Sequence, residues 1–159
     1  MPGIVLFDLD DTMLNREVAF KLWSSLFISK YGLSDRAWEE IRTCDADGYT
    51  PREEFFDEIK TLFGIEETTE SLVEQYHLDY PPCYSVEEIT VNSLRYLRAA
   101  GWKLGIVTNG PPSQRIKLEV TGITGEFDGI CVSSVVGYRK PDPAIFQEAA
   151  KMCASRLEG

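Results

Sequence analysis

The chain has 159 residues and a formal net charge of −10, with 43% hydrophobic and 26% charged residues. These are ordinary values for a globular domain, and they exclude a disordered or collagen-like chain. The excess of acidic residues repels phosphate backbones, so we expect no binding to nucleic acid. The apolar runs are short and the first ten residues contain no Lys or Arg, so we predict neither a membrane-spanning helix nor a signal peptide.

The cysteine and histidine content narrows the chemistry further. The four cysteines are far apart in the sequence and form no Cys-x-x-Cys pair: Cys44, Cys83, Cys131 and Cys153. We therefore expect free thiols in the reducing cytoplasm. A single histidine, His77, excludes a multi-histidine metal site.

Three short apolar runs rich in β-formers predict strands, at residues 4–7, 104–107 and 129–132. Each run is continuous rather than alternating, which is typical of strands that are buried on both faces of a parallel sheet. Each is followed by polar turn residues and then by a helical pattern.

Helices are predicted between and after these strands. One begins at the capping box Ser85–Glu88 and ends at Gly101, and a shorter one spans residues 113–122. Asp142 before Pro143 is typical of an N-cap followed by proline at the first helical position. With right-handed crossovers, this order predicts a doubly wound, Rossmann-like α/β sheet.

A long insert at residues 15–82 separates the first strand from the rest of the sheet and carries no strand pattern. Its apolar spacing predicts four amphipathic helices, the third beginning at the capping box Thr50–Glu53 with Pro51 at the first helical position. We therefore expect an α/β core made of residues 1–14 and 83–159, with an all-helical module inserted at residues 15–82.

Polar side chains follow each predicted strand. Asp8 and Asp10 come after the first strand, Thr108 and Asn109 at the end of the second, and Ser133 after the third. In open α/β sheets, ligands bind beyond the carboxyl ends of the strands, so we expect these residues to share one site.

The two aspartates define the chemistry of that site. Asp8 and Asp10 are two residues apart at one strand end, so they lie on the same side and repel each other unless a cation lies between them. Mg²⁺ prefers such oxygen ligands. Lys140 follows the third strand, and its ammonium group would support an anionic nucleophile and an anionic substrate.

Together these residues resemble the haloacid dehalogenase superfamily, in its phosphatase-like branch with a helical cap. The first motif of that family, Asp-x-Asp-x-Thr, matches Asp8, Asp10 and Thr12. The second, a Thr or Ser at the end of a later strand, matches Thr108, and the third matches Lys140 with the Pro-Asp-Pro that follows it. The helical insert resembles the family's cap.

The resemblance implies a magnesium-dependent hydrolase of phosphate monoesters that acts on a small phosphorylated metabolite. Asp8 would attack phosphorus to give an aspartyl-phosphate, and Asp10 would protonate the leaving group and then deprotonate water. The Asp8 carboxylate and the Asp10 main-chain carbonyl would bind Mg²⁺. Thr108, the main-chain amide of Asn109 and Lys140 would hold the phosphoryl oxygens.

The chain departs from the family at its end. The family's fourth motif is a further strand ending in acidic residues that complete the magnesium site, and it has no counterpart before the last residues, Leu157–Gly159. We therefore expect the C-terminal strands to be missing, weak magnesium binding, and self-association along the exposed edge of the first strand. The alternative function is a catalytically impaired fragment or an interaction module. A phosphoacceptor receiver domain is disfavoured because Ser133 and Ser134 stand where its phosphorylated aspartate would be.

Two alternatives concern the insert. Residues 43–54 nearly fit a calcium loop, with Gly48 at position six and Glu54 at position twelve, but Thr43 replaces the first aspartate. The other alternative is a loop from Asp45 to Arg52 that faces the active site, where Arg52 would meet a substrate anion. We expect His77 to lie on a helix of the insert without a ligand role.

Overall fold

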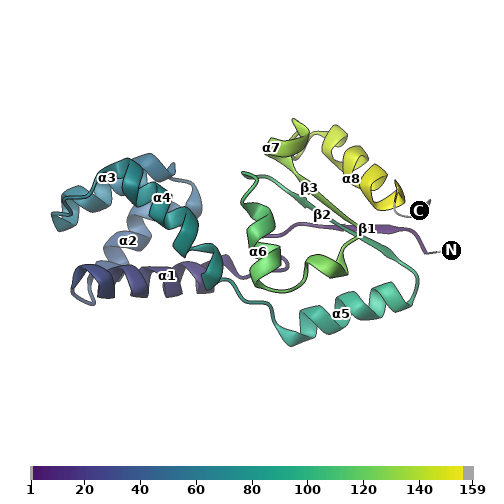
Figure 1. Cartoon of the computed structure of the whole chain (residues 1–159), viewed down its shortest axis with the longest axis horizontal. Coiled ribbons are helices and arrows are strands. Elements are labelled where there is room, and N and C mark those ends of the chain that lie inside the picture. The colour runs from purple at the N-terminus through teal and green to yellow at the C-terminus, as the bar shows by residue number, and fades with distance from the viewer. Residues whose placement is uncertain (1, 156–159) are drawn as a thin grey trace. The chain divides into compact units, whose positions relative to one another are not determined.

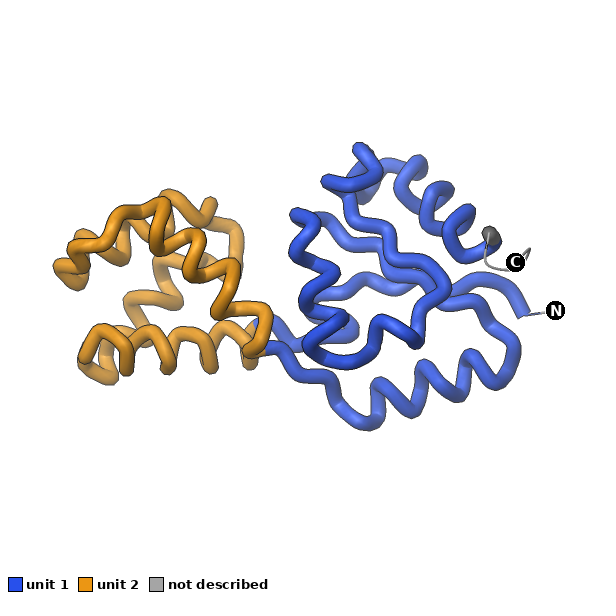
Figure 2. Tube along the Cα trace, viewed as in Figure 1, with its two compact units in different colours: residues 1–16, 84–159 blue, residues 17–83 orange. Residues whose placement is uncertain are grey.

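The computed structural model describes residues 2–155 of the chain. The last residues, where the expected departure from the family's fourth motif falls, lie outside this range. The chain separates into two compact units, shown in blue and orange in Figure 2. Unit 1 contains residues 1–16 and 84–159, and unit 2 contains residues 17–83.

Unit 1 is built on a parallel three-stranded sheet (Figure 1). Its strands are β1 (Ile4–Phe7), β2 (Lys103–Thr108) and β3 (Gly129–Val132), in the order β1-β2-β3. Both pairings are parallel. Parallel strands end at the same edge of the sheet, which brings the residues after β1, β2 and β3 together.

Helices cover both faces of this sheet. Figure 1 shows α8 (Pro143–Ser155) over one face and α5 (Glu88–Ala99) over the other. The remaining helices of unit 1 are short: α6 (Gln114–Val120), α7 (Ser133–Val136) and the 3-10 turn η3 (Thr124–Glu126). The predicted doubly wound α/β architecture is confirmed.

Two glycines let α8 lie close against the strands. A Cβ atom at Gly105 would lie 2.7 Å from the Cys153 Sγ atom, and one at Gly129 would lie 3.1 Å from the Cys153 main-chain nitrogen. Both distances are too short for an ordinary side chain to fit without a shift of its neighbours. On the same side, a buried cluster of Val107, Cys131 and neighbours on α8 fills the core.

The expectation that every strand is buried on both faces is wrong for β1. β2 is buried along almost its whole length, whereas the residues of β1 are half-buried or, at Ile4, 37% exposed. Among the described residues both β1 and β3 are edge strands, but α8 packs mainly on β2 and β3, so β3 is largely buried and β1 is less covered.

Two of the predicted helix starts are wrong. α5 begins at Glu88, after an extended Glu87, so the Ser85–Glu88 pattern is no capping box. In unit 2, the third helix begins after Pro51, which occupies the N-cap position rather than the first helical position. Asp142 does cap α8, because its carboxylate accepts a hydrogen bond from the Ala144 amide at 2.9 Å.

The described residues of unit 2 form helices only, as the sequence predicts. They are α1 (Arg16–Tyr31, whose first residue belongs to unit 1), α2 (Ala37–Asp45), α3 (Arg52–Phe63) and α4 (Thr69–Asp79), with 3-10 turns η1 (Ala46–Gly48) and η2 (Pro81–Cys83). Aromatic rings form the core, with Trp23 and Tyr76 meeting edge to face at 4.9 Å between centroids. Such pairs are stabilising beyond the area that they bury.

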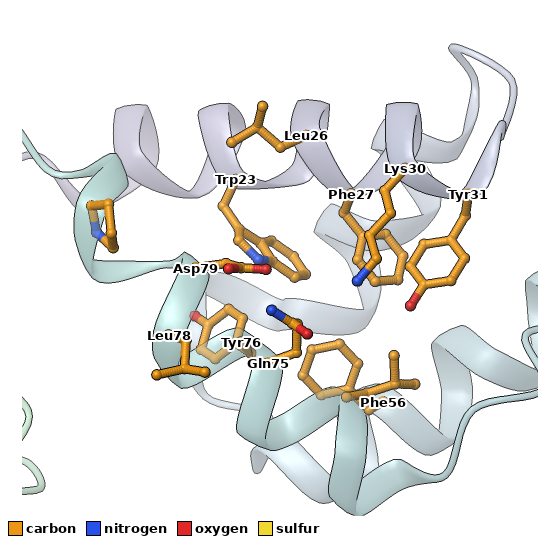
Figure 3. A pocket seen from close by; sticks show the side chains of 12 residues that line it. Trp23, Leu26, Phe27, Lys30, Tyr31, Phe56, Gln75, Tyr76, Leu78 and Asp79 are labelled. Carbon is orange, nitrogen blue, oxygen red and sulfur yellow. The ribbon is translucent and has the colours of Figure 1, made fainter.

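A hollow of about 310 Å³ lies within unit 2, bordered by α1 and α4 (Figure 3). Its walls are mainly apolar, and they include the aromatic residues Trp23, Phe27 and Phe56. Figure 3 shows the polar groups of Lys30 and Asp79 beside these rings. A hollow with carbon-rich walls is no match for a phosphate group.

None of the helices in the described part of the chain is long and apolar enough to cross a membrane.

Candidate active site

The carboxyl edge of the unit 1 sheet brings together the residues that the sequence analysis singled out. Asp8 follows β1 directly, Thr108 is the last residue of β2, and Ser133 follows β3. The strand register keeps these ends level, with Phe7 opposite Ile106 and Thr108 opposite Val132. The polar residues form two hydrogen-bonded groups at this edge.

The first group pairs Asp8 with Lys140. The Lys140 Nζ atom lies 2.6 Å from Asp8 Oδ1, and the Leu9 amide donates to the same oxygen at 2.8 Å. The Asp8 and Lys140 side chains are 46% and 25% exposed, respectively, so both can meet a ligand from solution. A carboxylate nucleophile with a cation beside it is the arrangement that attack on an anionic ester needs.

Asn109 holds the loop that carries Lys140. Its side-chain Nδ2 donates to the Lys140 carbonyl at 3.1 Å, and its Oδ1 accepts from the Lys140 amide at 2.8 Å. The side chain is therefore engaged with protein. The resemblance assigns phosphate binding to the main-chain amide of Asn109. The side-chain contacts do not test this role, which stays a prediction.

The second group surrounds Asp10, which does not contact Lys140 in the described contacts. The Lys117 Nζ atom lies 2.8 and 2.9 Å from the two carboxylate oxygens of Asp10. The Gln114 Nε2 atom donates to Oδ2 at 2.8 Å, and the Tyr84 hydroxyl donates to Oδ1 at 3.1 Å. Donors therefore contact both oxygens of this carboxylate.

These contacts favour the ionised form of Asp10. Burial alone would raise the pKa of Asp10, but Lys117, Gln114 and Tyr84 together hold it below its ordinary value. Burial lowers the pKa of Lys117, and the carboxylate of Asp10 opposes that effect. With Nζ–O distances under 3 Å, we assign an ion pair to these two residues.

Sequence reasoning missed Tyr84, Gln114 and Lys117. Gln114 and Lys117 are three residues apart at the start of the helix after Thr108, so both point to the same side of α6. That spacing was a usable signal. Tyr84 carries none, because nothing in the sequence connects it with Asp10, which lies 74 positions earlier.

Thr108 lies beneath the site surface. The residue is only 2% exposed, and its hydroxyl accepts a hydrogen bond from Gln114 Nε2 at 2.7 Å. Thr108 therefore belongs with Asp10 and Gln114, not with Asp8 and Lys140, in the hydrogen-bond network of the described residues.

A hollow of about 440 Å³ adjoins the site on unit 1. Asn109 and Gly110 line one part of it, and Ser133 and Arg139 line another. The Ser133 hydroxyl accepts a hydrogen bond from the Gly110 amide at 3.0 Å, which joins the ends of β2 and β3. The hollow is open and lies next to the residue before Lys140.

The residues present fit a magnesium ion held by few protein ligands. The Asp8 carboxylate and the Asp10 main-chain carbonyl are hard oxygen donors, and Mg²⁺ usually keeps several waters. The Asp10 carboxylate is committed to Lys117, Gln114 and Tyr84, so it is no ligand here. Within residues 2–155, no group of three or more His, Cys, Asp or Glu side chains is arranged to hold a metal.

The calcium alternative for the insert gains no support from the structure of unit 2. Asp45, which would stand at position three of the calcium-like loop at residues 43–54, is buried and accepts a hydrogen bond from the Arg52 guanidinium at 2.8 Å. Arg52 also donates to the Thr50 carbonyl and stacks on Phe55 and Tyr76. The Arg52 Nη2 atom is therefore bound within unit 2, whereas Nη1 is buried without a hydrogen-bond partner among the described residues. The contact of Arg52 with a substrate anion stays a prediction.

With this fold and site described, comparison with known proteins defines the class. The architecture is an α/β core with a helical insert after the first strand. A family model for haloacid dehalogenase-like hydrolases matches residues 3–158. This match covers nearly the whole chain, and the protein belongs to that family.

Individual relatives agree with this assignment. The phosphoglycolate phosphatase of Cereibacter sphaeroides (strain ATCC 17025 / ATH 2.4.3) is 28% identical over 164 residues, which cover 94% of this chain and 71% of that protein. The HAD phosphatase from Thermococcus onnurineus is 32% identical with a TM-score of 0.58, covering 97% of this chain and 72% of that one. The HAD-hydrolase YfnB from Bacillus subtilis, in a magnesium-bound crystal structure, has a TM-score of 0.73 at 24% identity, covering 92% and 69% of the two chains. The likeness to YfnB shows the fold alone.

Proposed function

We propose that this protein is a magnesium-dependent phosphate-monoester hydrolase that acts through an aspartyl-phosphate on Asp8. The observation that carries the proposal is the 2.6 Å contact between Asp8 and Lys140 at the carboxyl edge of the sheet, with Asp10 two residues further on. The phosphatases among its relatives support the reaction class. The substrate would be a small phosphorylated metabolite, and the free thiols support a cytoplasmic location.

The first half of the reaction forms one bond and breaks another. An Asp8 oxygen attacks phosphorus, and the bond from phosphorus to the leaving oxygen breaks. Asp10, carrying the proton that it takes from water in the second half of the preceding cycle, gives that proton to this oxygen so that an alcohol leaves. Lys140 stabilises the negative charge on the phosphoryl oxygens and on Asp8.

The second half regenerates the protein. Water attacks the phosphorus of the aspartyl-phosphate while Asp10, now a carboxylate, takes a proton from it. The bond between phosphorus and the Asp8 oxygen breaks, and inorganic phosphate leaves. A bound Mg²⁺ would supply charge neutralisation and a fixed orientation for the phosphoryl group. The helical insert would serve as a cap that excludes water from the site.

The test is hydrolysis of p-nitrophenyl phosphate by the purified chain, with Mg²⁺ or with a chelator. We expect turnover with Mg²⁺ only, and none in Asp8→Asn, because uncatalysed phosphate-monoester hydrolysis is extremely slow. Asp35→Asn, the same change at an exposed position of unit 2, is the matched control. Turnover by Asp8→Asn within about tenfold of the wild type would contradict the mechanism. A wild type that binds beryllium fluoride or Mg²⁺ but never hydrolyses the substrate would favour the alternative function, a catalytically impaired fragment or an interaction module.

A further inference from the structure

The side-chain amide of Gln114 lies between two residues of the candidate site. Its Nε2 atom is 2.8 Å from Asp10 Oδ2 and 2.7 Å from Thr108 Oγ1. Gln114 is 5% exposed and Thr108 is 2% exposed, so water does not compete freely for these bonds. The resemblance gives no role to Gln114, and the mechanism above does not use it.

The chemistry of these three groups fixes the direction of each hydrogen bond. An ionised carboxylate only accepts, so the amide atom that faces Asp10 is the nitrogen and not the oxygen. The same nitrogen faces Thr108, and an amide NH₂ only donates. The Thr108 hydroxyl is therefore the acceptor in this contact, and its own proton remains available for a different acceptor.

The surroundings keep the amide in this position. Lys117 contacts both oxygens of Asp10 and Tyr84 contacts one of them, so the carboxylate that anchors Gln114 cannot rotate freely. Gly110 leaves room for the glutamine: a Cβ atom there would lie 2.8 Å from Gln114 Cγ. The close contact with Gly110 and the ion pair between Lys117 and Asp10 thus both restrict the Gln114 side chain.

We propose that Gln114 is a positioning residue that orients the Thr108 hydroxyl as a donor toward an oxyanion of the substrate. The Asp10 carboxylate holds the side-chain amide of Gln114 in place. The NH₂ group of that amide donates to the Thr108 hydroxyl, which leaves the Thr108 proton for the substrate. This inference rests on the proposed phosphatase function. It differs from a packing role, in which only the volume of residue 114 would matter.

Two substitutions separate polarity from volume. Gln114→Glu keeps the shape but presents an acceptor to Thr108, which turns the hydroxyl proton away from the substrate. Gln114→Met keeps the approximate volume and leaves the hydroxyl free to rotate. If Gln114 positions the Thr108 hydroxyl, Gln114→Glu should weaken phosphate binding more than Gln114→Met does. If Gln114 only fills space, the isosteric Gln114→Glu should weaken phosphate binding less.

The measurements are the dissociation constant of inorganic phosphate by calorimetry in the presence of Mg²⁺, and KM and kcat for p-nitrophenyl phosphate. We expect the phosphate dissociation constant and KM to rise roughly tenfold in Gln114→Glu, which is the worth of one hydrogen bond to a charged group. The rise in Gln114→Met should be smaller. Gln147→Glu, on the exposed side of α8, is the matched control for the added charge and should change neither value.

A double-mutant cycle removes the direct effect of the new charge. The carboxylate introduced by Gln114→Glu repels phosphate with or without a hydroxyl at residue 108, so that contribution persists in a Thr108→Ala background. The contribution through the hydroxyl does not. We therefore expect Gln114→Glu to weaken phosphate binding less in Thr108→Ala than in the wild type. Fully additive effects would overturn the proposal.

Gly110→Ala tests the same residue without altering its chemistry. The new methyl group displaces the Gln114 side chain and should weaken phosphate binding in the same direction as Gln114→Met. Gly125→Ala, where a Cβ atom meets nothing within 4 Å, is its control. If Gln114→Glu fails to fold, phosphate binding that is unchanged in both Gly110→Ala and Gln114→Met would overturn the proposal.

The outcomes distinguish this inference from the proposed function. A wild type that binds phosphate and turns over, with Gln114 variants that do the same, would overturn the inference and leave the phosphatase assignment intact. A wild type that neither binds phosphate nor turns over would overturn both. Stronger loss in Gln114→Glu than in Gln114→Met, with the non-additivity above, supports the inference.

Discussion

Asn109 shows how one side chain places a cation in the candidate site. Both of its polar atoms bond the main chain of Lys140, at 2.8 and 3.1 Å, and the Lys140 side chain then reaches Asp8. The amide of an asparagine can donate and accept at once, whereas an ionised aspartate can only accept. The residue type at position 109 is therefore constrained by two hydrogen bonds of opposite direction.

Asn109→Asp is expected to lower turnover by roughly tenfold, because the Lys140 carbonyl loses its donor and faces a carboxylate instead. The loop would shift, and Lys140 with it. Steady-state kinetics with p-nitrophenyl phosphate measures the effect, and Asn92→Asp on α5 is the control. Unchanged kinetics in Asn109→Asp would show that the main-chain position of Lys140 does not depend on this side chain.

Asp128 contributes to stability through its charge. Its carboxylate accepts a hydrogen bond from the Leu104 amide at 2.9 Å, and Lys103 and Arg98 lie 3.3 Å from its oxygens. Burial alone would raise the pKa of Asp128, but the Leu104 amide and the two cations together hold it below its ordinary value. The folded state therefore favours the ionised form of this residue.

This lowered pKa predicts a pH-dependent stability. As the pH falls, the unfolded chain binds a proton before the folded chain does, so the contribution of Asp128 is complete above about pH 4 and is lost as the pH falls through the lower folded pKa. Asp128→Asn should lower the free energy of unfolding by about 1 kcal/mol at pH 7. Thermal melts should show this difference shrinking in more acidic buffer. A difference that is constant with pH, or equal to that of Asp35→Asn, would contradict the assignment.

At the scale of elements, α8 and the sheet are tied by close contact. The absence of side chains at Gly105 and Gly129 lets this helix approach β2 and β3, and Cys153 fills the space above them. Interiors are packed to crystal-like density, so an added methyl group has no space to occupy.

Gly105→Ala is expected to destabilise unit 1 by about 1–3 kcal/mol, because its Cβ atom would lie 2.7 Å from both Cys153 Sγ and Leu6 Cδ2. Urea denaturation followed by circular dichroism measures the change. Gly125→Ala provides the comparison, because the space around its Cβ position is empty. Equal stability of the two variants would mean that α8 shifts away from the sheet without cost.

The strands and most helices could be predicted from the sequence because their apolar spacing matches the period of each element. Helix starts were less predictable, since a cap contributes only about 1 kcal/mol and other contacts override it. Tyr84 illustrates this: it is buried, its hydroxyl bonds Asp10, and the helix begins only after an extended Glu87 instead of at Ser85.

Some features of the candidate site could likewise be predicted from the sequence, and others could not. The positions of Asp8, Thr108 and Lys140 at one sheet edge follow from strand ends, which the sequence reveals. The partners of Asp10 depend on how α6 is rotated above the edge, and only the structure shows that Gln114 and Lys117 face it. The burial of Thr108 was likewise invisible, because it depends on what covers the strand end.

At the scale of the whole molecule, β1 presents a row of peptide groups that pair with no strand among the described residues. The Gly3 carbonyl accepts from the Lys103 amide at 3.0 Å, so alternation directs the peptide groups of Ile4 to the outer edge. Exposed strand edges of apolar sequence are templates for pairing with another chain.

The 159-residue polypeptide is therefore expected to self-associate along β1. Ile4→Pro removes an outward-facing N–H group without breaking a bond to β2, so it should shift sedimentation toward the monomer. Ile4→Val keeps that group and should behave as the wild type. A wild type that sediments as a monomer at all concentrations would refute this prediction.

The four buried thiols give each unit a chemical reporter of its own. Cys44 and Cys83 lie in unit 2, and Cys131 and Cys153 lie in unit 1. Burial, with Glu58 nearby, raises the pKa of Cys44 to about 11, and burial also raises the pKa of Cys83 and Cys131. A buried, protonated thiol reacts with an alkylating reagent only after local opening. Time-resolved alkylation read by peptide mass spectrometry would therefore measure how often each unit opens, and whether the two open together, without adding any label to the chain.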